Sequence, residues 1–229
     1  MRSGGCLQAK IYFASDHRAL FDIIPHNNVH NGQEFIRSIG EDSDLCDAPF
    51  QAMGLGRRNC RSAGRGRRLL RPANFKRLLR RGVSRFKDEK YKGAVADFSK
   101  AISIRPKYTA AYIGRGDARI GLGQYEEAIA DFDQALQLQP DAPGVHYSRG
   151  IAKFMLGLFR GAIADYDQAV RLQPENAHAY FNRGLAKAEL GQHREALSDI
   201  RVALKFAREV GNSDFITRIE EKIQELDQG

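Results

Sequence analysis

The sequence has no tryptophan and only three cysteines in 229 residues. Cys6, Cys46 and Cys60 all lie within the first 60 residues, and no two of them form a CxxC pair. His26 and His30 could join two of these cysteines as metal ligands only across wide spacings. This pattern predicts neither a disulfide framework nor a zinc site, so we expect no metal and no cofactor.

Long apolar runs are also missing. No stretch approaches the roughly 20 apolar residues that a membrane-spanning helix needs. The N-terminus has no hydrophobic segment of the kind found in signal peptides, and its acidic residues do not suit a transit peptide. The sequence as given therefore favours a cytoplasmic protein without a membrane span.

Motifs of common catalytic sites are absent as well. The chain has no nucleophile elbow, phosphate-binding loop, dinucleotide fingerprint or HExxH motif. His178 and His193 stand alone in the sequence, without a neighbouring nucleophile or second histidine. We therefore expect a protein that is not an enzyme.

Acidic residues are missing from one segment. Residues 56–82 hold eleven lysines and arginines and no aspartate or glutamate. Residues 1–55 have an acidic excess, and residues 83–229 hold equal numbers of each sign. The formal net charge of +8 thus belongs to one segment and does not describe the whole chain.

What the sequence does contain is a period of 34 residues. Prolines stand at Pro72, Pro106, Pro140 and Pro174, and Arg-Gly dipeptides recur at 81–82, 115–116, 149–150 and 183–184. Two series of alanines keep the same period: Ala94, Ala128, Ala162, Ala196 and Ala101, Ala135, Ala169, Ala203. The strings YEEAIADFDQALQLQP and FRGAIADYDQAVRLQP are nearly identical. A fixed period of this length predicts stacked supersecondary units.

Each period predicts two helices joined by a short turn. Apolar residues recur at three- and four-residue spacings over 110–122, which end in a Leu-Gly stop signal. A second amphipathic stretch runs from about Tyr125 to Leu138 and closes at the proline. Small residues such as Gly116 and Ala128 would let the two helices approach closely, and Phe132 would fill the layer between units.

With glycine, alanine, aromatic, alanine and proline at these offsets, the period resembles the tetratricopeptide repeat. Numbered 1–34 with the proline at position 32, the units are 75–108, 109–142, 143–176 and 177–210. His146 and Leu78 depart from the family by replacing the usual aromatic residue at position 4. The resemblance implies an all-α, right-handed superhelical solenoid of helix-turn-helix hairpins.

The end of the repeat array is also readable. Arg208 replaces the proline in the fourth unit, so its second helix is expected to continue to about Val210. Residues 213–227 have one apolar face and one charged face. A stack of repeats must end in a helix that covers its last hydrophobic layer, and we predict that 213–227 is this capping helix.

Charged residues keep the period too. Position 7 is arginine and position 23 is aspartate in all four units: Arg81, Arg115, Arg149, Arg183 and Asp97, Asp131, Asp165, Asp199. Position 11 is always basic: Arg85, Arg119, Lys153, Lys187. Positions 7 and 11 lie one turn apart on one face of the first helix. We predict a ladder of Arg–Asp contacts between the helices, and the alternative is an anion-binding site.

The resemblance implies that positions 2, 5, 9, 12 and 13 face a concave groove. Apolar and aromatic residues in a row there indicate a protein-binding surface. The alternative is that several of them pack against adjacent helices or under the N-terminal segment. The predicted partner-binding residues are Leu79, Val83, Phe86, Ile113, Asp117, Ile120, Tyr147, Ile151, Phe154, Met155, Phe181 and Leu185. We expect an amphipathic helix or apolar peptide as the partner, of unknown identity.

One class of partner is not expected. Family members that clamp the C-terminal carboxylate of chaperones use lysine and asparagine at positions 5 and 9 of one unit. They add further polar and basic residues at positions 2 and 6 of the following units. No unit here has the Lys–Asn pair, and Gly144 and Ser148 occupy positions 2 and 6 of the third unit. The resemblance therefore argues against chaperone tails.

We predict that residues 1–74 form a poorly ordered segment that includes an Arg/Gly-rich stretch. Before that stretch, SDHRALFDII and GQEFIRSIG could form short helices. Three interpretations of 56–74 stay open. It could be a flexible arm that binds nucleic-acid phosphates, a solvated tail, or the product of a shifted reading frame or misplaced start. The first makes a nucleic-acid-associated adaptor using 56–82 the alternative to a protein-binding scaffold.

Overall fold

A computed structural model describes residues 72–228, and over this range the secondary structure is entirely helical. The helices are α3 (Pro72–Lys87), α4 (Tyr91–Ile104), α5 (Thr109–Ile120), α6 (Tyr125–Leu138), α7 (Pro143–Met155), α8 (Phe159–Leu172), α9 (Ala177–Glu189), α10 (His193–Val210) and α11 (Ser213–Asp227). Our predictions for residues 1–71, including the two short helices, the cysteines and the Arg/Gly-rich stretch, lie outside the described residues.

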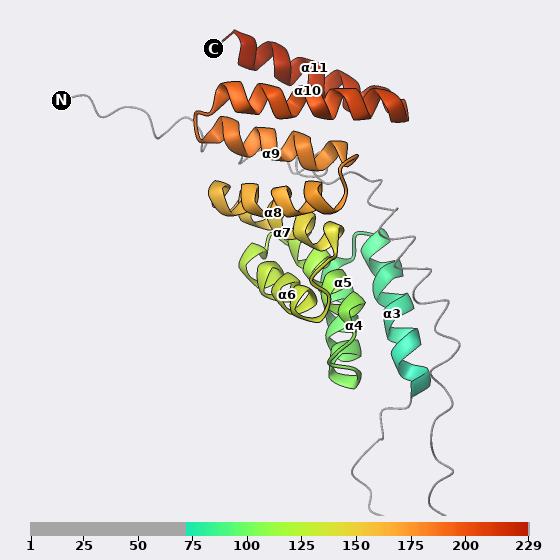
Figure 1. Cartoon of the computed structure of the whole chain (residues 1–229). Coiled ribbons are helices and arrows are strands. Elements are labelled where there is room, and N and C mark those ends of the chain that lie inside the picture. Colours follow the sequence, from blue (N-terminus) through green and yellow to red (C-terminus); the bar gives the residue numbers. More distant parts are fainter. Residues whose placement is uncertain (1–71, 229) are drawn as a thin grey trace, which may run out of the picture. The chain divides into compact units, whose positions relative to one another are not determined.

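The helices pack in the order of the sequence (Figure 1). The hairpins are α3–α4, α5–α6, α7–α8 and α9–α10, and the second helix of each packs on the first helix of the next. The first helices α3, α5, α7 and α9 also contact one another in succession. The predicted all-α repeat solenoid is confirmed, and none of the described helices is long and apolar enough to cross a membrane.

The helix boundaries follow the repeat period. The expected second helix lies at Tyr125–Leu138, and α10 runs on to Val210 as its missing proline predicts. The first unit begins earlier than expected, because α3 starts at Pro72 and not at Phe75. Proline suits the first position of a helix, where its lack of an N–H costs nothing and its fixed φ is already helical.

The turns inside the hairpins depend on glycine. Gly123 and Gly157 both have φ of +73°, in the left-handed region where a side chain is disfavoured. This conformation allows the N–H of Gln124 to donate to the carbonyl oxygen of Arg119 at 2.9 Å. The Leu-Gly pairs therefore end the first helices as predicted.

Small residues set the distance between the two helices of a hairpin. A Cβ added to Gly116 would lie 2.7 Å from Cε1 of Phe132, and one added to Gly150 would lie 2.6 Å from Cε1 of Tyr166. Phe132 and Ala128 are fully buried. In the first three hairpins the ring of the second helix thus packs directly on the backbone of the first helix, and in the fourth hairpin Ile200 takes the place of the ring, at a separation that any residue larger than glycine would prevent.

The helix α11 closes the C-terminal end of the stack. Phe215 and Ile219 are buried against Phe181, Ile200 and Ala203, with Ile216, Ile223 and Leu226 packed around them. Asn212 is the N-cap of α11, because its side-chain oxygen accepts a hydrogen bond from the N–H of Phe215 at 3.2 Å. In this way α11 covers the last hydrophobic layer.

Candidate binding surface

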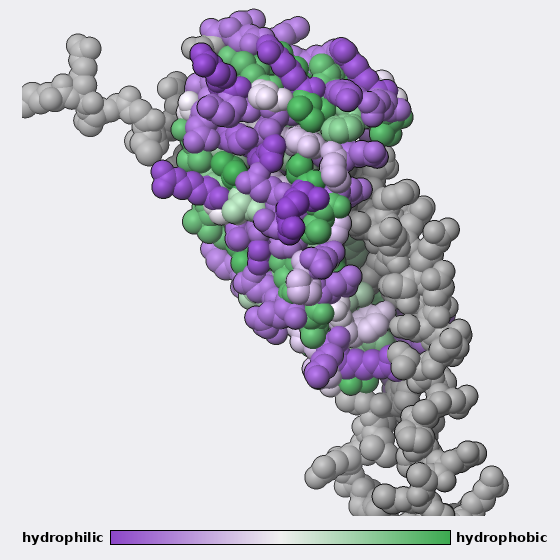
Figure 2. Space-filling model, viewed as in Figure 1, coloured by the Kyte–Doolittle hydropathy of each residue, from purple (hydrophilic) through white to green (hydrophobic). Residues whose placement is uncertain are grey.

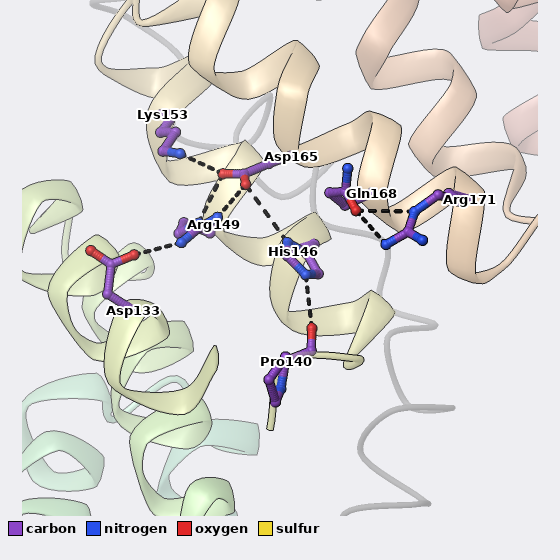
Figure 3. A network of polar contacts seen from close by, with 8 residues as sticks. All are labelled: Asp133, Pro140, His146, Arg149, Lys153, Asp165, Gln168 and Arg171. Atoms are coloured by element: carbon purple, nitrogen blue, oxygen red, sulfur yellow. Dashed lines mark hydrogen bonds and ion pairs between the residues drawn. The ribbon is translucent and has the colours of Figure 1, made fainter. Parts of the chain in front are cut away.

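A carboxylate lies at the centre of each repeat. In the third unit, Arg149 donates two hydrogen bonds to Asp165, from Nε to Oδ2 at 3.0 Å and from Nη2 to Oδ1 at 2.5 Å (Figure 3). Lys153 approaches Oδ2 at 2.7 Å. The Asp165 side chain is almost fully buried. The same pattern joins positions 7, 11 and 23 in the other three units, so the predicted ladder of Arg–Asp contacts is confirmed.

The ladder also links one unit to the next, which the sequence analysis missed. Nη1 of Arg149 contacts Oδ1 of Asp133 in the preceding unit at 2.6 Å (Figure 3), and Arg183 contacts Asp167 at the same distance. Arg115 reaches the hydroxyl of Ser99 at 3.2 Å. Position 25 is polar in the first three units (Ser99, Asp133, Asp167), but only the packed units show that this residue faces the position-7 arginine of the next unit.

These contacts answer the alternative of an anion site. In units two to four, each position-7 guanidinium already binds a carboxylate of its own unit and an oxygen of the preceding unit. A buried carboxylate with two cationic partners satisfies the requirement that buried charges be paired. The repeated charges therefore support the architecture and leave the binding function to other residues.

His146 shows how a departure from the repeat is accommodated. Its Nε2 lies 3.1 Å from the carbonyl oxygen of Pro140 (Figure 3). In the preceding unit, the hydroxyl of Tyr112 donates to the carbonyl oxygen of Pro106 at 3.0 Å. The imidazole thus makes the same link between helix and loop as the tyrosine that it replaces, and it is a packing residue.

We call the side of the stack formed by positions 2, 5, 6, 9, 12 and 13 of α3, α5, α7 and α9 the first-helix face. Of the predicted partner-binding residues, those buried in the structure are Leu79, Ile120, Tyr147, Ile151, Phe154 and Phe181. Those partly exposed are Val83, Phe86, Ile113, Asp117, Met155 and Leu185. The buried residues pack within the stack of helices, as the alternative interpretation of these positions proposed. The partner-binding role of all twelve stays a prediction.

Polar links join neighbouring first helices on this face. Ser148 of α7 interacts with the carboxyl group of Asp117 of α5 and favours its ionised form. One unit further, Nδ2 of Asn182 in α9 donates to the hydroxyl of Tyr147 at 3.0 Å. Ser148 and Asn182 both occupy position 6, which the family resemblance did not place among the groove positions.

Burial shifts the pKa values of Asp117 and His178 on this face. Although the Asp117 side chain keeps some exposure, the loss of water around its carboxyl group raises its pKa to about 7, and Ser148 opposes part of that shift. Burial, together with the positive charge of Arg218, lowers the pKa of His178 to about 4. His178 is therefore neutral near pH 7, where its ring stacks on Phe215 at a centroid distance of 4.1 Å.

The capping helix contributes a cation at the C-terminal end of the face. The guanidinium of Arg218 lies 6.0 Å from the ring centroid of Phe181 and 5.8 Å from that of Phe215. The first-helix face thus has a carboxyl group in the second unit, apolar side chains on either side, and a guanidinium next to the fourth unit.

Hydrophobic residues do not gather into one large area on the side of the molecule shown in Figure 2, where they are scattered among hydrophilic ones. Within residues 72–228, no three histidine, cysteine, aspartate or glutamate side chains are grouped so as to hold a metal ion. What the described residues offer is an extended helical surface.

Four similar hairpins, an internal charge ladder and a capping helix define an α-helical repeat solenoid. A family model described as "TPR repeat" matches residues 116–157 and 158–191. A second family model, described as "Tetratricopeptide repeat", matches residues 177–209. Residues 116–209 are therefore tetratricopeptide repeats. No curated protein sequence matches it.

Solved structures show the same fold at low identity. The crystal structure of MamA is 18% identical with a TM-score of 0.57, covering 69% of this chain and 94% of its own. The first tetratricopeptide domain of human RPAP3 is 25% identical with a TM-score of 0.51, covering 53% and 95%. The first such domain of Spaghetti (RPAP3), bound to the HSP90 peptide SRMEEVD, is 24% identical with a TM-score of 0.51, covering 53% and 96%.

Proposed function

We propose that the chain is a non-catalytic adaptor that binds a peptide or helix of another protein along the first-helix face. The observation that carries this proposal is that the structural positions of the repeat are uniform, whereas the partly exposed positions vary. Positions 7 and 23, which hold the stack together, are the same in every unit. Positions 5, 6, 9, 12 and 13 change from unit to unit and include the partly exposed residues.

The chemistry of the face favours a mainly apolar ligand. Ile113, Met155 and Leu185 are partly exposed and offer apolar contact on three successive first helices. Asp117 lies among them and can accept a hydrogen bond from a backbone or side-chain donor of the ligand. A segment that adds apolar side chains at helical or extended spacing fits this arrangement.

Chaperone tails need a direct test. The domain of Spaghetti (RPAP3) was solved with an HSP90 peptide, so the comparisons do not support the predicted exclusion of such tails. The residues of this chain still argue for exclusion. Position 9 of the second unit is an acid, Asp117, and position 2 of the fourth unit is His178, which is neutral near pH 7. We expect no measurable binding of the peptide SRMEEVD by isothermal titration calorimetry, and clear binding would overturn this part of the proposal.

The proposal as a whole is tested by substituting exposed positions. Ile113→Glu/Met155→Glu places two charges on the first-helix face, while Ala130→Glu/Ala164→Glu places two on exposed positions of the second helices. Tyr147 and Phe181 are unsuitable, because they are buried and their replacement would test folding.

Affinity capture from a cell lysate, with circular dichroism as a check on folding, measures the effect. Proteins recovered by the wild type and by the second-helix variant should be lost with the first-helix variant. Equal recovery by all three chains would contradict binding on this face.

A further inference from the structure

The first helices of units two to four share a face that meets the preceding unit. At position 3, Ala111, Val145 and Ala179 are buried. At position 6, a Cβ added to Gly114 would lie 2.7 Å from Cζ of Phe98 in the preceding second helix. At position 7, the arginine reaches an oxygen at position 25 of that same helix. Positions 3, 6 and 7 therefore form the side by which one unit stacks on another.

In the first unit these three positions are all arginine. Arg77, Arg80 and Arg81 are exposed, and α3 carries no acidic residue. The Arg81 side chain is 45% exposed, compared with 15–19% for the position-7 arginines of the other units. We call these three residues the arginine end face.

One hydrogen-bonding group on this face is unused within the described residues. Arg81 binds Asp97 through Nε at 2.7 Å and through Nη2 at 2.5 Å. In units two to four, Nη1 of the equivalent position-7 arginine contacts a residue of the preceding unit, which is Ser99, Asp133 or Asp167. For Arg81, no acceptor among residues 72–228 meets Nη1. The face is therefore an incomplete copy of an interface that the molecule forms three times.

We propose that the arginine end face docks an acidic helix of a partner protein. Its carboxylate would take the place against Arg81 that Asp133 takes against Arg149. A second acid one residue before it would face Arg80, which stands where the later units have Gly114, Ser148 or Asn182. The inference concerns the end of the stack and does not rest on the ligand proposed for the first-helix face, although Arg80, at position 6, belongs to both surfaces.

Two sources within the same protein do not supply this carboxylate. Counting back one period from Ser99 gives Arg65, and residues 56–71 contain no acid at all. A second copy stacked head to tail would present position 25 of its fourth unit, which is Arg201, at 3.6 Å from Asp227 of its own capping helix. Both would oppose one arginine with another, so neither the adjoining segment nor a head-to-tail copy supplies the carboxylate, and the occupant that we propose is an acidic helix of a partner protein.

The charge also argues against one more regular repeat as the occupant. Phe98 packs both on Gly82 at position 8 of its own unit and on Gly114 at position 6 of the next unit. Arg80 is long and charged, so it cannot receive an aromatic ring in the way that Gly114 does. An acidic side chain facing Arg80 would form an ion pair with its guanidinium, whereas an aromatic side chain there would remove water from the guanidinium without pairing its charge.

The probe for the test is derived from the molecule's own interface. A peptide with the sequence of α6, residues 125–138, presents Asp133 on a helix of the right geometry. In the probe, Phe132→Glu supplies the second acid, and a covalent link between the exposed positions 126 and 130 holds the short peptide helical. The control peptide carries Phe132→Gln and Asp133→Asn, and a 20-nucleotide oligothymidine serves as the nucleic-acid probe.

Fluorescence anisotropy at near-physiological salt compares the full chain with two charge-reversal variants. Arg77→Glu/Arg80→Glu changes the arginine end face without removing Arg81, whose loss would leave the buried Asp97 with one partner fewer. Arg160→Glu/Arg194→Glu makes the same charge change at exposed positions of α8 and α10.

The acidic peptide should bind the wild type and the Arg160/Arg194 variant equally, and the Arg77/Arg80 variant at least tenfold more weakly. The control peptide should bind all three weakly. Equal binding of the acidic peptide to every variant, or no binding to any, would overturn the proposal. Tight binding of oligothymidine that is lost with Arg77→Glu/Arg80→Glu, without a preference for the acidic peptide, would assign the face to nucleic acid and also overturn it.

Discussion

The ladder and the first-helix face share the first helices of the repeats but follow opposite rules. At positions 7 and 23, all four units carry the same residue type, and the contacts between them repeat with almost the same distances. At position 9, the four units carry Val83, Asp117, Ile151 and Leu185. A stack needs the same junction each time, whereas a ligand meets each unit with a different part of its surface. Uniformity within the chain therefore indicates architecture, and variation at an accessible position indicates recognition.

The largest expected effect comes from removing a carboxylate of the ladder. Asp131→Ala leaves Arg115 and Arg119 mostly buried without their shared partner, and we expect a loss of about 3 kcal/mol in the free energy of unfolding. Asp97→Ala should cost roughly half as much, because Arg81 and Arg85 are 45% and 36% exposed and can turn to water. Urea unfolding followed by circular dichroism measures both. Equal losses would show that exposure of the arginines does not govern the ladder.

A glycine of the hairpin gives the next largest effect. Gly150→Ala would place a Cβ 2.6 Å from the Tyr166 ring, and the repacking should cost about 2 kcal/mol. Gly161→Ala is the matched control, since its Cβ would meet only the aliphatic part of the Lys153 side chain, with Cδ at 3.3 Å. The control should be neutral or gain up to about 1 kcal/mol from helix propensity. Thermal unfolding of both variants tests this, and a destabilised Gly161→Ala would contradict the packing argument.

Much of this architecture could be predicted from the sequence, because its residues repeat. The second helix at Tyr125–Leu138, the extension of α10 to Val210 and the pairing of positions 7 and 23 all follow from one 34-residue period. The contact from Arg149 to Asp133 could not be predicted in this way, because it depends on how two units sit against each other. The same limit applies to the first-helix face. Position within the repeat suggested Tyr147 and Ile151 as accessible residues, but the close approach of neighbouring helices buries them.

Asp117 offers a smaller effect that depends on pH. Burial raises its pKa to about 7 in the folded chain, above the ordinary value of 3.8, so the folded state holds this proton more tightly than the unfolded state. The resulting stabilisation is present below about pH 4 and is lost as the pH rises to 7. Asp117→Asn should remove this dependence and leave the variant more stable than the wild type by about 1–2 kcal/mol at pH 8. Melting temperatures measured from pH 4 to pH 8 give the two slopes, and parallel slopes would contradict the shifted pKa.

The smallest effect on stability is expected where variation between units is greatest. Ile113 is partly exposed, and its counterparts at position 5 are Leu79, Tyr147 and Phe181. Ile113→Gln should reduce the free energy of unfolding by no more than about 1 kcal/mol, because little apolar area returns to water. The same change should weaken binding of any ligand captured on the first-helix face by tenfold or more, as measured by calorimetry with that ligand. Asp131→Ala, compared at a temperature where it is still folded, should do the reverse and keep the affinity while losing stability. A loss of both properties in each variant would show that the ladder and the first-helix face are not separate in function.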